Sequence, residues 1–146
     1  MLLPITMTAA AACALIGIWL GIRVSQVRRA AGVAHGDGGH GLLVRRMRAH
    51  ANFVENAPFF LILLLLPERA GGSAFYLWAA AIVFIGARLL HPFGMDRDGA
   101  NPLRIAGIAL SWSVIGALAV WTIALSYAQL AANQPERRPA PAMLKS

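Results

Sequence analysis

Three polar residues with helical spacing precede the apolar run LILLLL. Arg48, Asn52 and Glu55 are separated by four and three residues, so a helix of about 3.6 residues per turn places them on one narrow face. Arg45 shares this face and His50 points away from it. Lipid cannot solvate such a face, which must look into the bundle, a partner subunit or a water-filled pocket. Ionisable groups within a membrane span predict a functional site, and the alternative is an internal Arg–Glu pair that joins helices.

More arginines are expected at the same end of the bundle. Arg88 and His91 are three residues apart at the end of the third apolar run, Arg104 begins the fourth run and Arg28 follows the first. The guanidinium group of arginine matches a carboxylate through two parallel hydrogen bonds. Because Glu55 alone can use only one of these arginines, their excess indicates an anionic ligand.

The composition is that of a membrane protein. Apolar residues make up 58% of the 146 residues, charged residues make up 13%, and the mean hydropathy is +0.62. A soluble domain has about 25% charged residues. The net charge of +7 fits cytoplasmic loops beside anionic lipid, and we expect no nucleic-acid partner. Cys13 is the only cysteine, so we expect it to be a small packed residue rather than part of an internal disulfide.

The hydropathy pattern predicts four membrane-spanning helices, at about residues 2–31, 42–66, 73–92 and 103–130. A bilayer core needs about 20 apolar residues as helix. The run from Ala57 to Leu66 is too short alone, so its helix must begin near Leu42 and include the polar face. Pro67 and the pair Gly71-Gly72 are expected to end this helix. We predict one uncleaved domain over residues 1–132, followed by a polar, proline-rich tail over 133–146 that is expected to be disordered.

The loops differ in their content of arginine. The first and third connections are rich in arginine, whereas the second holds only Arg69. By the positive-inside rule, the first and third connections lie in the cytoplasm and both termini lie outside. The first connection contains HGDGGH, residues 35–40, whose glycines predict a flexible turn. Two histidines beside one aspartate lack a third ligand, so we expect a solvated loop and no bound metal.

Two further expectations concern the fourth helix. Asp96 and Asp98 are expected to cap the turn that leads into it. Gly107 and Gly116 give it small surfaces that allow close contact with other helices.

The pattern R-x-H-x-N-x-x-E-x-x-P-F, from Arg48 to Phe59, resembles the signature of the MAPEG family, the membrane-associated proteins in eicosanoid and glutathione metabolism. The GDGG turn before the second helix and the RLLHPFG segment after the third resemble the small bacterial branch of this family. The resemblance covers the chain up to its tail. It implies a four-helix membrane bundle in the bacterial inner membrane, assembled as a homotrimer, with glutathione bound between neighbouring subunits near the cytoplasmic side.

The resemblance also implies roles for individual residues. Arg28 would contact a glutathione carboxylate, and Glu55 would take the γ-glutamyl ammonium. Arg104 would hold the thiolate, because a nearby cation lowers the pKa of a thiol from its usual value of about 8.5. The thiolate would then attack a lipophilic electrophile that enters from the bilayer between the first and fourth helices. The implied glutathione-binding residues are Arg28, Arg48, Asn52, Glu55, Arg88 and His91.

One position departs from the family pattern. Met95 stands one turn after His91, where transferases of the family often have a tyrosine. Three functions therefore stay open: a glutathione transferase or peroxidase, a non-catalytic membrane protein that binds glutathione or lipid, and a small transporter subunit. The sequence shows neither the inverted repeats nor the broken helices that are typical of transporters.

Overall fold

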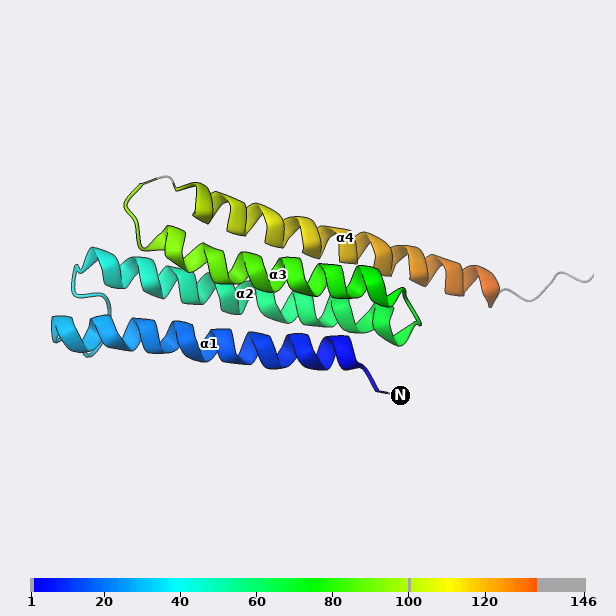
Figure 1. Ribbon diagram of the computed structural model, residues 1–146, viewed down its shortest axis with the longest axis horizontal. Helices are drawn as coiled ribbons and strands as arrows, with labels where there is room; N and C mark the ends of the chain where they lie inside the picture. Colours follow the sequence, from blue (N-terminus) through cyan, green and yellow to red (C-terminus); the bar gives the residue numbers. More distant parts are fainter. Residues whose placement is uncertain (1, 100, 134–146) are drawn as a thin grey trace, which may run out of the picture.

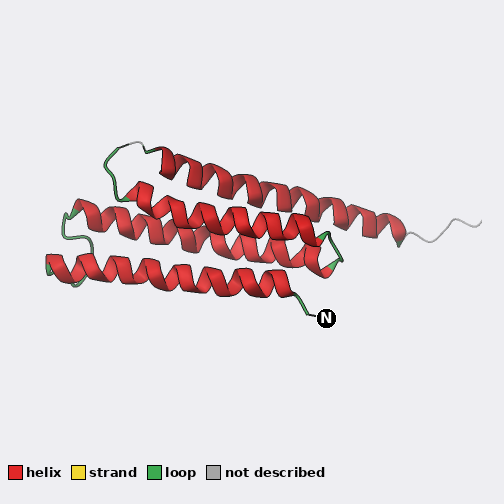
Figure 2. Cartoon of the chain, viewed as in Figure 1, coloured by secondary structure: helices red, strands yellow, loops and turns green. Residues whose placement is uncertain are grey.

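The computed structural model describes residues 2–99 and 101–133, which form four α-helices and no strand (Figures 1 and 2). The helices are α1 Pro4–Ala31, α2 Gly41–Arg69, α3 Ala74–Met95 and α4 Pro102–Ala132. All four are long and apolar enough to cross a membrane. The predicted all-α class and the four-helix bundle are confirmed. The predicted tail lies outside the described residues, apart from Asn133, which follows the last turn of α4.

Two helices continue past a proline that lies near their predicted ends, at residues 66 and 92. α2 passes through Pro67 and ends at Arg69, and α3 passes through Pro92 and ends at Met95. A proline removes one backbone N–H, which interrupts one hydrogen bond of the helix without stopping it. The chain turns instead at Gly71, whose φ of +77° favours glycine. The predicted helix end at residue 66 was therefore about one turn early, whereas Gly71 belongs to the glycine pair that was predicted to end the helix.

The outer helices, α1 and α4, lie on opposite sides of the α2–α3 pair (Figure 1). Each packs on both α2 and α3, and they make no contact with each other within the described residues. The fourth helix is the least covered, since only Gly107, Ser111 and Leu118 are buried in it. Both outer helices therefore leave long apolar faces for lipid or for another protein chain.

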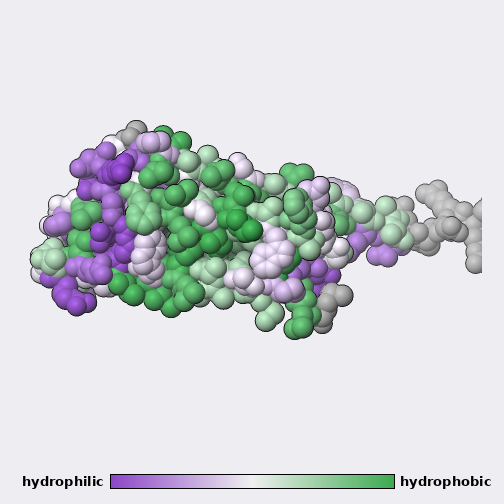
Figure 3. Space-filling view, in the orientation of Figure 1, coloured by the Kyte–Doolittle hydropathy of each residue, from purple (hydrophilic) through white to green (hydrophobic). Residues whose placement is uncertain are grey.

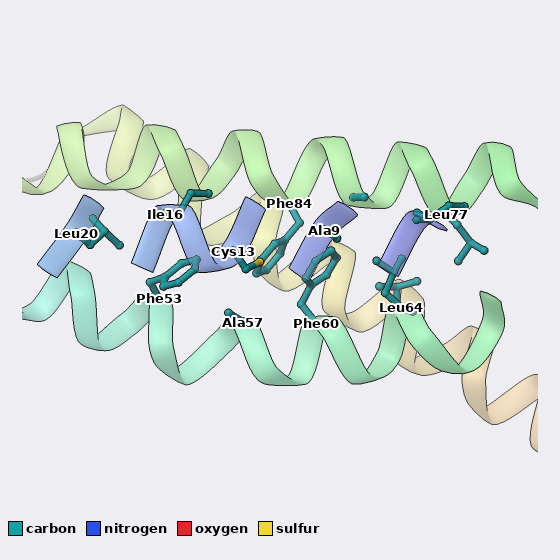
Figure 4. Close-up of a cluster of buried hydrophobic side chains, with 13 residues drawn as sticks. Ala9, Cys13, Ile16, Leu20, Phe53, Ala57, Phe60, Leu64, Leu77 and Phe84 are labelled. Atoms are coloured by element: carbon teal, nitrogen blue, oxygen red, sulfur yellow. The ribbon is translucent and has the colours of Figure 1, made fainter. Parts of the chain in front are cut away.

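The apolar core lies between α1, α2 and α3 (Figure 4). Phe60 of α2 and Phe84 of α3 are fully buried, and their stacked rings lie 3.8 Å apart. Ala9 and Cys13 present small side chains from α1, so that the helices can approach closely. The expectation that Cys13 is a small packed residue agrees with its burial.

Glu68, at the end of α2, closes the first turn of α1. Its carboxylate accepts hydrogen bonds from the backbone N–H groups of Ile5 and Thr6, at 2.9 and 2.8 Å, and from the Thr6 hydroxyl at 2.6 Å. The first N–H groups of a helix have no partner within it, and the helix dipole favours a negative charge there. This contact fixes α1 against α2 at one end of the bundle.

The opposite end of the bundle carries most of the polar surface. In Figure 3, hydrophilic side chains gather over the α1–α2 and α3–α4 turns, and the middle of the molecule is apolar. An apolar belt between polar ends is the pattern of a bundle that spans a bilayer. The residues with possible chemistry lie at the polar end.

Candidate functional site: a polar cluster between α2, α3 and α4

Arg88 is the centre of a buried polar cluster. Its side chain is 2% exposed. Nη1 donates to Oδ1 of Asn52 on α2, and Nη2 donates to the carbonyl oxygen of Gly107 on α4, both at 2.8 Å. The guanidinium carbon lies 5.7 Å from the ring centroid of Phe84, within the range of a cation–π contact. One arginine of α3 therefore joins three helices.

The close approach of α3 and α4 depends on two glycines. A Cβ atom at Gly107 would lie 2.8 Å from Cβ of His91 and 2.9 Å from the carbonyl oxygen of Ala87. A Cβ atom at Gly94 would overlap the backbone of Arg104. The first turns of α4 can therefore rest directly on the last turns of α3. Ser111 also donates to the Gly107 carbonyl, at 2.7 Å.

His91 and Arg104 are joined through the backbone of Arg104. His91 is 3% exposed, and its Nδ1 lies 3.3 Å from the Arg104 carbonyl oxygen, to which it donates when protonated at that nitrogen. The side chain of Arg104 is exposed. The structure thus holds the backbone of Arg104 in place, while its guanidinium forms no hydrogen bond or ion pair within residues 2–99 and 101–133.

Arg48 and Glu55 lie on the surface of the protomer. Both are exposed, and Asn52 between them is half-buried. The buried face of α2 includes Phe53 and Phe60, so the helical spacing turns Arg48 and Glu55 away from the core. Within residues 2–99 and 101–133 neither forms an ion pair, the three observed pairs being made by other side chains. The alternative of an internal Arg–Glu pair is wrong for Glu55 in the protomer.

The two aspartates of the α3–α4 turn do not cap α4. Asn101 does so, because its Oδ1 accepts a hydrogen bond from the backbone N–H of Leu103 at 3.0 Å. Asn101 directly precedes Pro102, the first residue of the helix, and this is the position from which a side chain reaches the free N–H groups. Asp96 and Asp98 lie too early in the turn, and the prediction for them was wrong.

Instead, these aspartates pair with arginines of α1 and α2. Asp96 forms ion pairs with Arg23 and, at 3.3 Å, with Arg46, and Asp98 pairs with Arg45. The Arg23 guanidinium also lies 4.8 Å from the centroid of the Trp19 ring. The α3–α4 turn is therefore tied to both α1 and α2 at this end of the bundle. Sequence reasoning missed this role, although two carboxylates at the arginine-rich end were the available signal.

Arg28 takes part in the first connection. Its Nη1 donates to the carbonyl oxygen of Gly36 at 2.7 Å, and its Nη2 lies 3.4 Å from the sulfur of Met47. In the single protomer Arg28 thus fixes the HGDGGH loop against α2.

The structure therefore brings together part of the predicted site. Asn52 is bonded to Arg88, and His91 to the backbone of Arg104. The other predicted side chains form no hydrogen bond with this cluster within the described residues; they are Arg28, Arg48, Glu55 and the guanidinium of Arg104.

An apolar groove of about 760 Å³ opens between α3 and α4, lined among others by Tyr76, Leu110 and Trp121. Leu110 is six residues after Arg104, so the two lie about 120° apart around α4. The groove therefore belongs to a different flank of the helix from the Arg104 side chain.

The chain matches known membrane proteins. The model of the MAPEG family matches residues 6–124. The chain is also similar to "Inner membrane protein YecN" of Escherichia coli (strain K12), with 33% identity over 83 residues, which are 57% of this chain and 63% of that protein. The protein of the same name from Escherichia coli O6:H1 gives the same values. The match thus spans less than two thirds of the length of these relatives.

Proposed function

The chain belongs to the MAPEG family, and from this premise we propose that it is a glutathione transferase or peroxidase of the bacterial inner membrane. It would bind glutathione at the polar end of the bundle and use its thiolate to attack lipophilic electrophiles. The inner-membrane location is supported by the four membrane-length helices and by the name of the relative from Escherichia coli.

The observation that carries the proposal is the exposed pair of opposite charges on α2. Arg48 and Glu55 lie on either side of Asn52 and have no ion-pair partner within the described residues. An ionised side chain that faces lipid is costly, so this face needs a polar partner. Glutathione has two carboxylates and one ammonium group. Arg48 matches a carboxylate, and Glu55 matches the ammonium.

The second expected feature is a site between copies of the chain. A polar face is better covered by a neighbouring subunit than by lipid. The family resemblance implies a homotrimer, in which glutathione would fill the remaining space between subunits. Because α1 and α4 make no contact within the described residues of one protomer, an electrophile that enters between these helices would have to pass between α1 of one subunit and α4 of another.

Arg104 is the proposed catalytic residue. Its backbone is positioned by Gly94 and His91, and its guanidinium is exposed at the same end of the bundle as Arg48. A cation beside the glutathione sulfur stabilises the thiolate over the thiol. The thiol proton leaves to water, the sulfur forms a bond to the electrophilic carbon, and the leaving group departs with its electron pair.

Conjugation of glutathione to 1-chloro-2,4-dinitrobenzene by the protein in detergent tests the proposal, together with reduction of a lipid hydroperoxide. We expect turnover with at least one substrate class and thermal stabilisation by glutathione. Absence of turnover over a range of electrophiles and hydroperoxides would exclude the enzyme. Absence of stabilisation as well would exclude glutathione as the ligand.

A second function is favoured by Met95. This residue supplies no hydroxyl at the position where a tyrosine would contact glutathione, and it is only half-buried near the end of α3. A protein that binds glutathione or lipid without turnover fits this feature. Its signature is stabilisation by glutathione without conjugation, whereas flux through proteoliposomes would instead support a transporter subunit.

A further inference from the structure

We infer that Arg88 is a positioning residue that turns the amide of Asn52, so that Asn52 donates a hydrogen bond to an oxygen acceptor of the ligand. The inference rests on the proposed function for the identity of the ligand. It differs from the direct glutathione contact of Arg88 that the family resemblance implies.

The orientation of the Asn52 amide follows from hydrogen-bond chemistry. A guanidinium group has donors and no acceptor, so the atom of Asn52 that lies 2.8 Å from Nη1 of Arg88 is the oxygen, Oδ1. The amide nitrogen, Nδ2, must then point in the other direction. It donates no hydrogen bond within the described part of the chain, and it is not among the buried atoms that lack a partner. This nitrogen is therefore an accessible, unused donor.

Its neighbours on the helix define what this donor can bind. Arg48 and Glu55, one turn before and after Asn52, are exposed on the same side of α2. Asn56 uses its own amide nitrogen to bond the backbone carbonyl of Asn52, at 2.7 Å. The surface thus offers the Arg48 guanidinium and the Asn52 N–H side by side, and two such donors match a carboxylate or a peptide carbonyl.

Arg88 itself is not placed to touch the ligand. It is 2% exposed, and both of its terminal nitrogens already hold protein oxygens on α2 and α4. Its third nitrogen, Nε, is also buried and has no partner within the described residues. Because the side chain is almost fully covered, a peptide could reach the guanidinium only if α2, α3 and α4 moved apart. Arg88 therefore acts on the ligand through Asn52.

The substitution Asn52→Asp separates the contact between residue 52 and Arg88 from the contact between residue 52 and the ligand. A carboxylate at position 52 still accepts from Arg88 and supplies a negative charge to a buried arginine that has no ion-pair partner among the described residues. The helices should therefore stay joined. The same substitution replaces the outward N–H by an oxygen, which repels an acceptor group of the ligand.

The experiment compares wild type with Asn52→Asp, Asn52→Ala, Arg88→Met and the double variant Asn52→Ala/Arg88→Met in detergent. It measures the melting temperature without ligand and the glutathione Kd by calorimetry. We expect Asn52→Asp to melt at or above the wild-type temperature and to bind glutathione at least tenfold more weakly. We expect the double variant to bind as weakly as Asn52→Ala alone, because Arg88 has no separate contact to lose.

A control is Asn56→Asp, which adds the same charge one turn later on the same helix without contacting Arg88, and which also removes the hydrogen bond from Asn56 to the Asn52 carbonyl. It should not raise the melting temperature. The inference is overturned if Asn52→Asp binds glutathione as tightly as wild type, or if the double variant binds tenfold more weakly than Asn52→Ala. If Arg88→Met fails to fold, Asn52→Asp, which retains the arginine, decides the question alone.

Failure of the proposed function would be visible separately, as absence of glutathione binding by the wild-type protein. In that case the melting temperatures still test the positioning contact. A lower melting temperature for Asn52→Asp than for wild type would overturn it, and a higher temperature that Asn56→Asp does not reproduce would support it.

Discussion

Asp96, in the turn after α3, forms an ion pair with Arg23, a buried arginine in the interior of α1. The same carboxylate pairs with Arg46 of α2 at 3.3 Å. One acidic side chain thus connects the turn that precedes Arg104 to the two helices on the other side of the bundle. Part of the arginine excess at this end is therefore structural, and it is not available to a ligand.

Removing the charge of Asp96 should destabilise the protein. Asp96→Asn leaves two partly buried arginines without their carboxylate, and we expect a loss of about 2 kcal/mol in unfolding free energy. SDS-induced unfolding in mixed micelles measures it. Asp98→Asn is the control, since the Asp98 side chain is 88% exposed and its pair with Arg45 should contribute less than about 1 kcal/mol. Equal losses for the two variants would contradict this difference.

Gly107→Ala should push α4 away from α3. The added methyl group would lie 2.8 Å from Cβ of His91 and 2.9 Å from the Ala87 carbonyl oxygen, so we expect a loss of about 1–3 kcal/mol. Gly116→Ala is the matched control in the same helix, because a Cβ atom there meets nothing within 4 Å. It should be neutral or stabilising by up to about 1 kcal/mol. Thermal unfolding of both variants in one detergent makes the comparison, and a destabilising Gly116→Ala would indicate a contact beyond the protomer.

Glu68→Ala should release the first turn of α1. The substitution leaves the N–H groups of Ile5 and Thr6 without their acceptor, and we expect a loss of about 1–2 kcal/mol. Hydrogen–deuterium exchange should accelerate at these two amides while the core amides near Phe60 stay protected. Glu68→Gln keeps one acceptor oxygen and should lie between the alanine variant and wild type. Unchanged exchange at Ile5 and Thr6 would argue against the cap.

Arg104→Ala should reduce the fraction of bound glutathione present as thiolate. Each pKa unit that the arginine lowers corresponds to about 1.4 kcal/mol, or a tenfold change in the thiolate-to-thiol ratio. The pH dependence of thiolate absorbance and the kcat for conjugation should both report it, with glutathione binding largely retained. Arg97→Ala removes an exposed arginine of the neighbouring α3–α4 turn and serves as the control. Loss of rate in both variants to the same extent would speak against a specific role for Arg104.

The assembly can be checked by native mass spectrometry of the protein released from detergent micelles. We expect three copies of the chain per particle. Glu55→Lys, which replaces the carboxylate of the exposed face by a like charge beside Arg48, should weaken the assembly or the binding of glutathione within it. A monomer that binds glutathione as tightly as the assembled protein would show that the site is complete within one chain.

Much of the fold was accessible to sequence reasoning because the relevant signals are local. The length and hydropathy of each segment predict a membrane-spanning helix, and the spacing of Arg48, Asn52 and Glu55 places them on one face. The ends of α2 and α3 were less well predicted. A proline near a helix end costs one hydrogen bond, and the helix can continue past it when the sharper turn comes later, at Gly71.

The candidate site could be predicted less well than the fold, because it depends on how the helices pack against one another. Gly107 and Gly116 are alike in sequence, and only their neighbours show that Gly107 holds α4 against His91 while Gly116 faces open space. Likewise, charge alone does not separate Arg88, which is buried and bonded to Asn52, from Arg104, whose side chain is exposed.

Residue types and their intervals along the chain were therefore enough to establish four membrane helices, the polar face of α2 and the family. They could not tell which arginines are already paired. The partners of Arg23, Arg46 and Arg88 come from the α3–α4 turn or from another helix, and a spacing within one helix does not specify which side chain of another element lies opposite. Long-range packing sets those distances, and with them it sets which charges remain for a ligand.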